Sequence, residues 1–136
     1  LSMNISVNTD NLDKIVTTDE KWLEFIFGQL LSNSMKYISD CHEPELNLYT
    51  EENKDSIVFH FRDNGIGISA SDLPYIFDKS YTGENGRTHS QSTGMGLYIV
   101  KSLCNRLGHK ITAESVKGEF TDIIITFGKS DHVKPI

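Results

Sequence analysis

The sequence has 136 residues, a length that suits one domain with a buried core. Its formal net charge of −6 argues against a general nucleic-acid surface, which needs clustered lysines and arginines. No apolar run approaches the roughly 20 residues that cross a bilayer, so we expect a chain that neither spans a membrane nor carries a signal peptide. Cys41 and Cys104 lack the spacing of a zinc site or a disulfide framework, and we expect two reduced thiols.

The first elements are predicted to be a short hairpin and a long helix. Residues 1–3 have the character of an arbitrary start, such as a cloning remnant, and are left out of the fold. Residues 4–8 and 14–17 flank a polar turn and predict two short strands. Thr17 and Glu20 match a capping box, and the apolar spacing that follows predicts a helix over residues 19–39.

This predicted helix has two distinct faces when its residues are placed at about 100° each. One face is apolar apart from one serine, and we expect it to lie in the core: Leu23, Phe27, Leu30, Leu31, Ser34 and Ile38. The other face carries Gln29, Asn33, Lys36 and Tyr37. Two carboxamides, an ammonium group and a phenol ring over two turns suit a metal, a phosphate and a base. The same residues also suit an ordinary solvated helix face.

A second hairpin and the first of two glycine-rich turns come next. Residues 46–50 and 56–62 alternate between apolar and polar types and predict antiparallel strands around a polar stretch. The second of these strands runs into Asp63-Asn64-Gly65-Ile66-Gly67-Ile68. Residues 69–72 then can cap a short helix that reaches Phe77, with a proline near its first turn.

Two common nucleotide-binding motifs almost match the chain, and we reject both. Residues 65–70 fit the dinucleotide pattern GxGxxA, but no parallel βαβ unit follows them. Gly128-Lys129-Ser130 has the ending of a P-loop, yet Ile123 stands where the earlier glycine is required.

The C-terminal half contains a polar loop and the second glycine turn. Residues 79–92 lack an apolar period and predict a mobile loop of the kind that forms lids. Gly94-Met95-Gly96-Leu97 opens a predicted helix that ends at Gly108. Strands are predicted at residues 110–116 and 122–127, followed by a frayed tail over 128–136. Glycines at a helix N-terminus let backbone N–H groups approach an anion closely, so a phosphate site is the first hypothesis.

The order of these motifs resembles the catalytic ATP-binding domain of sensor histidine kinases, which belong with the Hsp90, gyrase B and MutL ATPases. The resemblance covers about residues 18–127, and the stretch 77–97 is similar to Gram-positive kinases linked to antimicrobial-peptide transporters. It implies an α/β (α+β) two-layer sandwich, the Bergerat ATP-binding fold. A mixed sheet would carry helices on one face, with ATP held between those helices and a lid at residues 79–92.

Roles on the polar helix face follow from the same resemblance. Asn33 should ligate Mg²⁺ through its carboxamide oxygen, a hard ligand for a hard ion. Lys36 should contact phosphate, and Tyr37 should pack near the adenine. Gln29 stands where the ATPase branches have a glutamate general base and many kinases have asparagine. A neutral amide cannot take a proton from water, so we expect poor ATP hydrolysis and a γ-phosphate preserved for a histidine.

The resemblance assigns the base-binding and lid roles as well. Asp63 should accept a hydrogen bond from the adenine amino group, although an aspartate here can also simply cap a turn. Gly65 and Gly67 should leave room for the base, and Thr121 should lie near it, although Phe120 replaces the usual preceding glycine. The remaining implied ATP-site residues are Ile68, Gly94, Met95, Gly96 and Leu97 from the two glycine turns, Phe77 as the lid's anchor, and Lys79 and Arg87 as lid cations or solvated side chains.

The implied function is transfer of the γ-phosphate of MgATP to a histidine on a separate dimerisation domain. None of the five histidines lies in the helical context of the phosphorylated one, so we expect the isolated chain to be inactive in autophosphorylation. The implied partners are that dimerisation and phosphotransfer domain and a response regulator, without nucleic acid. We expect a cytoplasmic, monomeric segment of a homodimeric protein in the bacterial cell membrane. The alternatives are a GHKL-type ATPase and a nucleotide-binding or protein-binding module without transfer activity.

Overall fold

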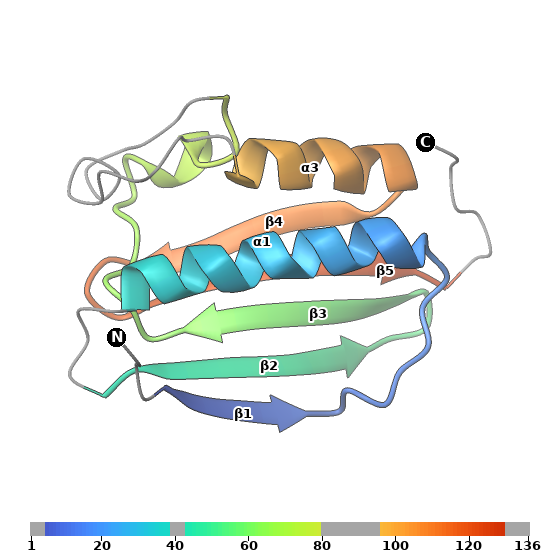
Figure 1. Ribbon diagram of the computed structural model, residues 1–136, viewed down its shortest axis with the longest axis horizontal. Helices are drawn as coiled ribbons and strands as arrows, with labels where there is room; N and C mark the ends of the chain where they lie inside the picture. The colour runs from blue at the N-terminus through green and yellow to red at the C-terminus, as the bar shows by residue number, and fades with distance from the viewer. Residues whose placement is uncertain (1–4, 39–42, 80–95, 130–136) are drawn as a thin grey trace.

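The computed structural model describes residues 5–38, 43–79 and 96–129 and shows two layers, a five-stranded sheet and the helices that cover it (Figure 1). The strands are β1 (Ser6–Asp10), β2 (Glu45–Glu52), β3 (Ser56–Asp63), β4 (Lys110–Val116) and β5 (Phe120–Gly128). They lie in the order β1-β2-β3-β5-β4. Only β1 and β2 pair in parallel among these neighbours, and the other three pairs are antiparallel, so the expected mixed sheet is confirmed.

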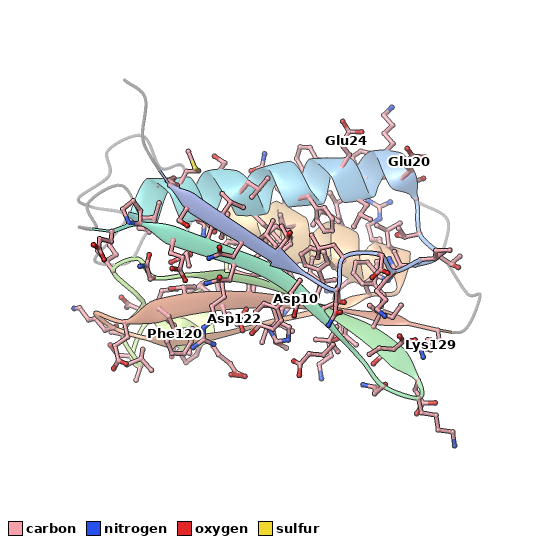
Figure 2. The ribbon with its side chains drawn as sticks, turned by 90° about the horizontal axis from the view of Figure 1, so that it is seen from below. Asp10, Glu20, Glu24, Phe120, Asp122 and Lys129 are labelled. Carbon is pink, nitrogen blue, oxygen red and sulfur yellow. The ribbon has the colours of Figure 1, made fainter. Side chains whose placement is uncertain are left out.

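Both α-helices of the described residues lie on one face of the sheet (Figure 2). They are α1 (Glu20–Ile38) and α3 (Gly96–Leu107), and a short 3₁₀ helix, η1 (Leu73–Tyr75), lies between them in the chain. Their apolar sides pack on the strand residues that point toward them, which makes one continuous core. Its buried members include Ile26, Leu30, Phe61, Ile76, Val100, Leu103, Leu107, Ile111, Ile123, Ile125 and Phe127. The predicted arrangement of helices on one face is therefore confirmed.

The start of α1 differs from the predicted capping box. The helix is capped by Asp19, whose Oδ1 accepts a hydrogen bond from the backbone N–H of Trp22 at 3.2 Å. Aspartate is as good a cap as threonine, and here it lies directly before the first helical residue. Within α1, Ile26 is fully buried, whereas Leu31 is 38% exposed because it lies at the outer margin of the apolar face. The prediction for Thr17, Glu20 and Leu31 was wrong.

The predicted N-terminal hairpin is also wrong. Residues 14–17 form no strand, and β1 pairs in parallel with β2, with Ser6 opposite Glu45 and Asp10 opposite Tyr49. All five residues of β1 are exposed. The parallel pairing of two strands that are far apart in the sequence depends on tertiary packing. The local alternation of apolar and polar residues does not reveal such a pairing.

The remaining predicted strands and the helix that ends at Gly108 are confirmed where the structure describes them, whereas the predicted short helix is a 3₁₀ helix, Leu73–Tyr75, that does not reach Phe77. β2 and β3 form one of the two predicted hairpins that are present, and β4 and β5 form the other, around residues 117–119. α3 ends before Gly108, which has a φ of +85°, the left-handed conformation that favours glycine at this position. Most of the predicted lid and most of the predicted tail lie outside the described residues. No helix in the described part of the chain is long and apolar enough to cross a membrane.

The sheet face away from the helices carries a polar cluster centred on the buried residues His60 and Asp122. The His60 ring places Nδ1 2.8 Å from Asp122 Oδ2 and Nε2 2.6 Å from Glu51 Oε1, so it joins three strands. Tyr49 stacks on His60 with ring centroids 4.4 Å apart. Arg62 lies over the Phe120 ring at 3.8 Å, and Figure 2 shows Phe120 and Asp122 on the side of the sheet opposite Glu20 and Glu24. Burial raises the pKa of Asp122, and its hydrogen bond with His60 opposes that shift.

Candidate functional site

The predicted site residues come together at one end of the molecule. There the C-terminal end of α1, the end of β3, the β4–β5 turn and the start of α3 lie close to one another (Figure 1). The first glycine turn connects them, because the Ile66 N–H donates to the Tyr37 carbonyl at 3.3 Å and the Gly118 N–H donates to the Ile66 carbonyl at 2.7 Å. The turn is therefore held against both layers of the fold.

Asp63 is the buried carboxyl group of this site. It is the last residue of β3, its exposed fraction is 3%, and its Oδ1 accepts a hydrogen bond from the Gly65 N–H at 2.9 Å. Burial raises the pKa of Asp63 to about 6, although hydrogen bonds from the Gly65 N–H and the Ser34 hydroxyl favour the carboxylate. The turn-capping role is thus present in the structure, and the adenine contact stays a prediction.

Gly65 and Gly67 are required by the close approach of other backbone segments. A Cβ on Gly65 would lie 2.7 Å from the Tyr37 carbonyl oxygen, and one on Gly67 would lie 2.3 Å from the Val116 carbonyl oxygen. Gly67 also has a φ of +72°, which side-chain-bearing residues rarely adopt. Contacts within the protein therefore explain why these two positions need glycine. The resemblance suggested a different reason, namely that glycines leave room for the base.

Thr121 lies beside Asp63 across the sheet. The two residues are direct partners in the β3–β5 register, and both are buried. The Thr121 hydroxyl is 3.0 Å from Ser115 Oγ, which also accepts a hydrogen bond from the Ile68 N–H at 2.8 Å. The structure therefore places Thr121 and Ile68 in one hydrogen-bonded group, although Phe120 replaces a glycine.

The polar face of α1 is partly buried, and Gln29 on it lies beside α3. Gln29, Asn33, Lys36 and Tyr37 are all partly buried, so this face is not simply solvated. Burial lowers the pKa of Lys36, whose Nζ lies 5.2 Å from the centroid of the Tyr37 ring, and burial raises the pKa of Tyr37. A Cβ on Gly96 would lie 3.2 Å from Gln29 Oε1, which places the Gln29 amide at the N-terminus of α3. Backbone N–H groups at such an end favour an anion.

The residues assigned to the lid are only partly described. Phe77 and Leu97 are partly buried and pack against the core, and Lys79 is exposed. Lys101 on α3 places its Nζ 5.2 Å from the centroid of the Phe77 ring. Arg87, Gly94 and Met95 lie outside the described residues, so their roles stay predictions.

Two serines of this site were missed by sequence reasoning. Ser34 was assigned to the apolar core face of α1, yet its hydroxyl bonds to Asp63. Ser115 was treated as an ordinary strand residue. Ser34 is the one hydroxyl among large apolar residues on the core face of α1. A hydroxyl buried there needs a hydrogen-bond partner, and that requirement was the available signal in the sequence. Ser115 offered no comparable signal.

Comparison with known protein families supplies the deciding observation. Residues 18–131 match the family described as histidine kinase-, DNA gyrase B- and HSP90-like ATPases. The chain belongs to this family. The match covers most of the sequence, including every described site residue, and it confirms the resemblance found from the two glycine turns and the Asn33 helix.

Relatives within this ATPase family are sensor histidine kinases. Sensor histidine kinase YxdK of Bacillus subtilis is 40% identical over 116 residues, which make up 85% of this chain and 35% of that protein. Sensor histidine kinase GraS of Staphylococcus haemolyticus is 38% identical over 123 residues, 90% of this chain and 34% of that protein. The chain thus spans about a third of the length of these relatives. The predicted Gram-positive sensor-kinase branch is confirmed, whereas the link to peptide transporters stays a prediction.

Solved structures confirm the fold. The mycobacterial sensor histidine kinase MprB aligns with a TM-score of 0.80 at 18% identity, over 97% of this chain and 86% of that one. Full-length ShkA in complex with AMPPNP aligns with a TM-score of 0.74 at 17% identity, over 96% of this chain and 26% of that one. At these identities the likeness concerns the fold, which is that of histidine kinase catalytic domains.

Proposed function

We propose that this chain binds MgATP and delivers its γ-phosphate to a histidine on a dimerisation and phosphotransfer domain. One observation carries the proposal: buried Asp63 lies under the first glycine turn, at the same end of the fold as the polar face of α1 and the N-terminus of α3. The carboxylate proposed to select the base, the residues proposed to bind metal and phosphate, and a helix N-terminus that favours an anion would then share one site. In phosphoryl transfer, such positioning and charge neutralisation supply most of the catalysis.

The described residues fit the nucleotide in chemical type. Asn33 would hold Mg²⁺ through its amide oxygen, Lys36 would contact a phosphate oxygen, and Asp63 would accept the adenine amino proton. Bound magnesium would neutralise charge on the transferred group. Gln29 belongs to α1, and its side-chain amide lies beside the N-terminus of α3. A neutral amide cannot act as a base toward water. This supports transfer to a protein histidine over hydrolysis.

The parent protein is proposed to be a two-component sensor kinase with a downstream response regulator. The relatives' names as sensor histidine kinases support this reading. We propose a homodimeric protein anchored in the bacterial cell membrane, with this segment as its monomeric, cytoplasmic catalytic domain. Residues 79–92 are proposed as its ATP lid, with Lys79 and Arg87 directed toward the terminal phosphates.

Calorimetric titration with ATP and GTP tests the binding half of the proposal. We expect a preference for ATP that Asp63→Asn reduces at least about tenfold, because an amide presents a donor as well as an acceptor. Asp55→Asn removes an exposed carboxylate in the β2–β3 turn and serves as the charge-matched control. Equal affinity for ATP and GTP in the unmodified chain would contradict the adenine contact.

The magnesium role is tested separately. Asn33→Ala should remove the dependence of ATP affinity on Mg²⁺, measured by titration with and without EDTA, while Asn105→Ala on exposed α3 surface should leave it intact. Retained magnesium dependence in Asn33→Ala would show that another residue holds the ion.

A further inference from the structure

Ser115 joins the two parts of the base-binding region through one hydroxyl group. It lies on β4 and pairs with Thr121 of β5. Its Oγ accepts from the Ile68 N–H at 2.8 Å, donates to the Phe120 carbonyl at 2.6 Å, and lies 3.0 Å from Thr121 Oγ1. The serine therefore connects the end of the first glycine turn to the start of β5.

Counting protons fixes the direction of these hydrogen bonds. A hydroxyl has one proton to donate and two lone pairs that accept. The Phe120 carbonyl can only accept, so it takes the Ser115 proton, and the Ile68 N–H can only donate, so it uses one lone pair. The Thr121 hydroxyl must then donate to the other lone pair. Its proton is committed to Ser115, and only its lone pairs remain for other partners.

This polarity matters because Thr121 stands next to Asp63. The two are cross-strand partners on the helix-covered face of the sheet, and the Asp63 carboxylate accepts hydrogen bonds only. Two neighbouring acceptors favour a base edge that presents an amino group, as adenine does. They disfavour the carbonyl that guanine presents at the same position, because acceptors facing one another are left unpaired.

We propose that Ser115 is a positioning residue for base selection, which holds Ile68 in place and fixes Thr121 as an acceptor. The proposal rests on the proposed ATP-binding function and adds to it the group that sets the hydrogen-bonding polarity of the pocket. Ser115 itself need not touch the nucleotide.

The test compares ATP and GTP affinities, by calorimetric titration of the whole chain, in Ser115→Ala and Ser115→Cys. Cysteine keeps the size of serine, but its thiol is a weak donor and acceptor. In both variants we expect the ratio of ATP to GTP affinity to fall roughly fivefold to tenfold, the effect of about one hydrogen bond. Ser115→Thr keeps the hydroxyl and should restore the ratio. Thr112→Ala, an exposed position on the same strand, is the matched control and should leave it unchanged.

If Ser115 has a purely structural role, its variants should lower the affinities for ATP and GTP equally. An unchanged ratio of the two affinities, in a protein that prefers ATP, would therefore overturn this inference and leave the proposed function standing. If the unmodified chain binds neither nucleotide, both fail. If the Ser115 variants do not fold, hydrogen exchange at the Ile68 amide of the unmodified chain decides. Slow exchange supports the bond to Ser115, and exchange as fast as in an exposed loop overturns it.

Discussion

Asp63 is the residue of the proposed ATP site whose ionisation we expect to affect nucleotide binding. Its pKa of about 6 means that the carboxylate is mostly protonated at pH 5 and mostly ionised at pH 7.5. A protonated carboxyl offers a donor where the adenine amino group needs an acceptor. We therefore expect ATP affinity to be about tenfold weaker at pH 5 than at pH 7.5, measured by calorimetry at saturating magnesium. Asp63→Asn should remove this pH dependence, and a flat profile in the unmodified chain would contradict the role.

The same pKa makes a prediction about folding without nucleotide. Because burial holds the Asp63 pKa above its unfolded value, the folded state binds the proton more tightly. This group's contribution to stability therefore declines as pH rises from about 4 to about 6 and is constant above that range. Denaturant unfolding of the unmodified chain and Asp63→Asn across this range would show the difference.

Gly67 and Gly118 form a matched pair that separates backbone strain from crowding. Both have positive φ, but a Cβ on Gly67 would meet the Val116 carbonyl at 2.3 Å, whereas one on Gly118 would meet nothing within 4 Å. We expect Gly118→Ala to cost about 1 kcal/mol of unfolding free energy and Gly67→Ala about 2–4 kcal/mol. Equal losses in urea titrations would show that the first glycine turn can move away from β4.

At the scale of elements, α1 contains an internal weak point. Gly28 lies in the middle of this helix, is exposed, and has open space where a Cβ would lie. Since glycine costs a helix about 1 kcal/mol relative to alanine, Gly28→Ala should raise the unfolding free energy by about 0.5–1 kcal/mol. Thermal unfolding would detect the gain, and ATP affinity should not change, because this position faces away from Asn33. A loss of stability would mean that another segment approaches the helix here.

Elements with strong local patterns could be predicted from sequence, and non-local pairings could not. The length of α1, its polar face and the end of α3 at Gly108 follow from periodicity and glycine chemistry alone. A strand near β1 was predicted, but its pairing was not, because its partner, β2, lies beyond a whole helix and because the exposed residues of β1 leave no alternating pattern. In the site, Asp63 stood out as the residue that opens a glycine turn. The hydroxyls of Ser34 and Ser115 matter only through partners that folding brings to them.

At the scale of the whole molecule, the prediction concerns what the chain cannot do alone. The site holds residues suited to ATP, but His60 and His109, the buried histidines of the described chain, lie in the sheet cluster and against Phe127. We expect no acid-labile phosphate on the isolated chain after incubation with labelled MgATP. Adding the proposed dimerisation and phosphotransfer domain as a separate chain should give labelled histidine on that domain.

The control for this experiment is Asn33→Ala, which should abolish transfer while binding of the added domain persists. Stable labelling of the isolated chain on one of its own histidines would contradict the division of labour between two domains. Rapid release of free phosphate without an acceptor would favour an ATPase.

The polar cluster around His60 has a consequence for strand alignment. Side chains alternate along β3 and β5, so Asp63 and Thr121 point into the site while Arg62 and Asp122 point to the opposite face. A slip of one residue between these strands would carry a buried carboxylate into the apolar core and turn the threonine outward. By tying Asp122 to β3 and β2, His60 makes that misaligned pairing costly. The cluster on one face of the sheet thereby keeps Asp63 and Thr121 on the other, helix-covered face.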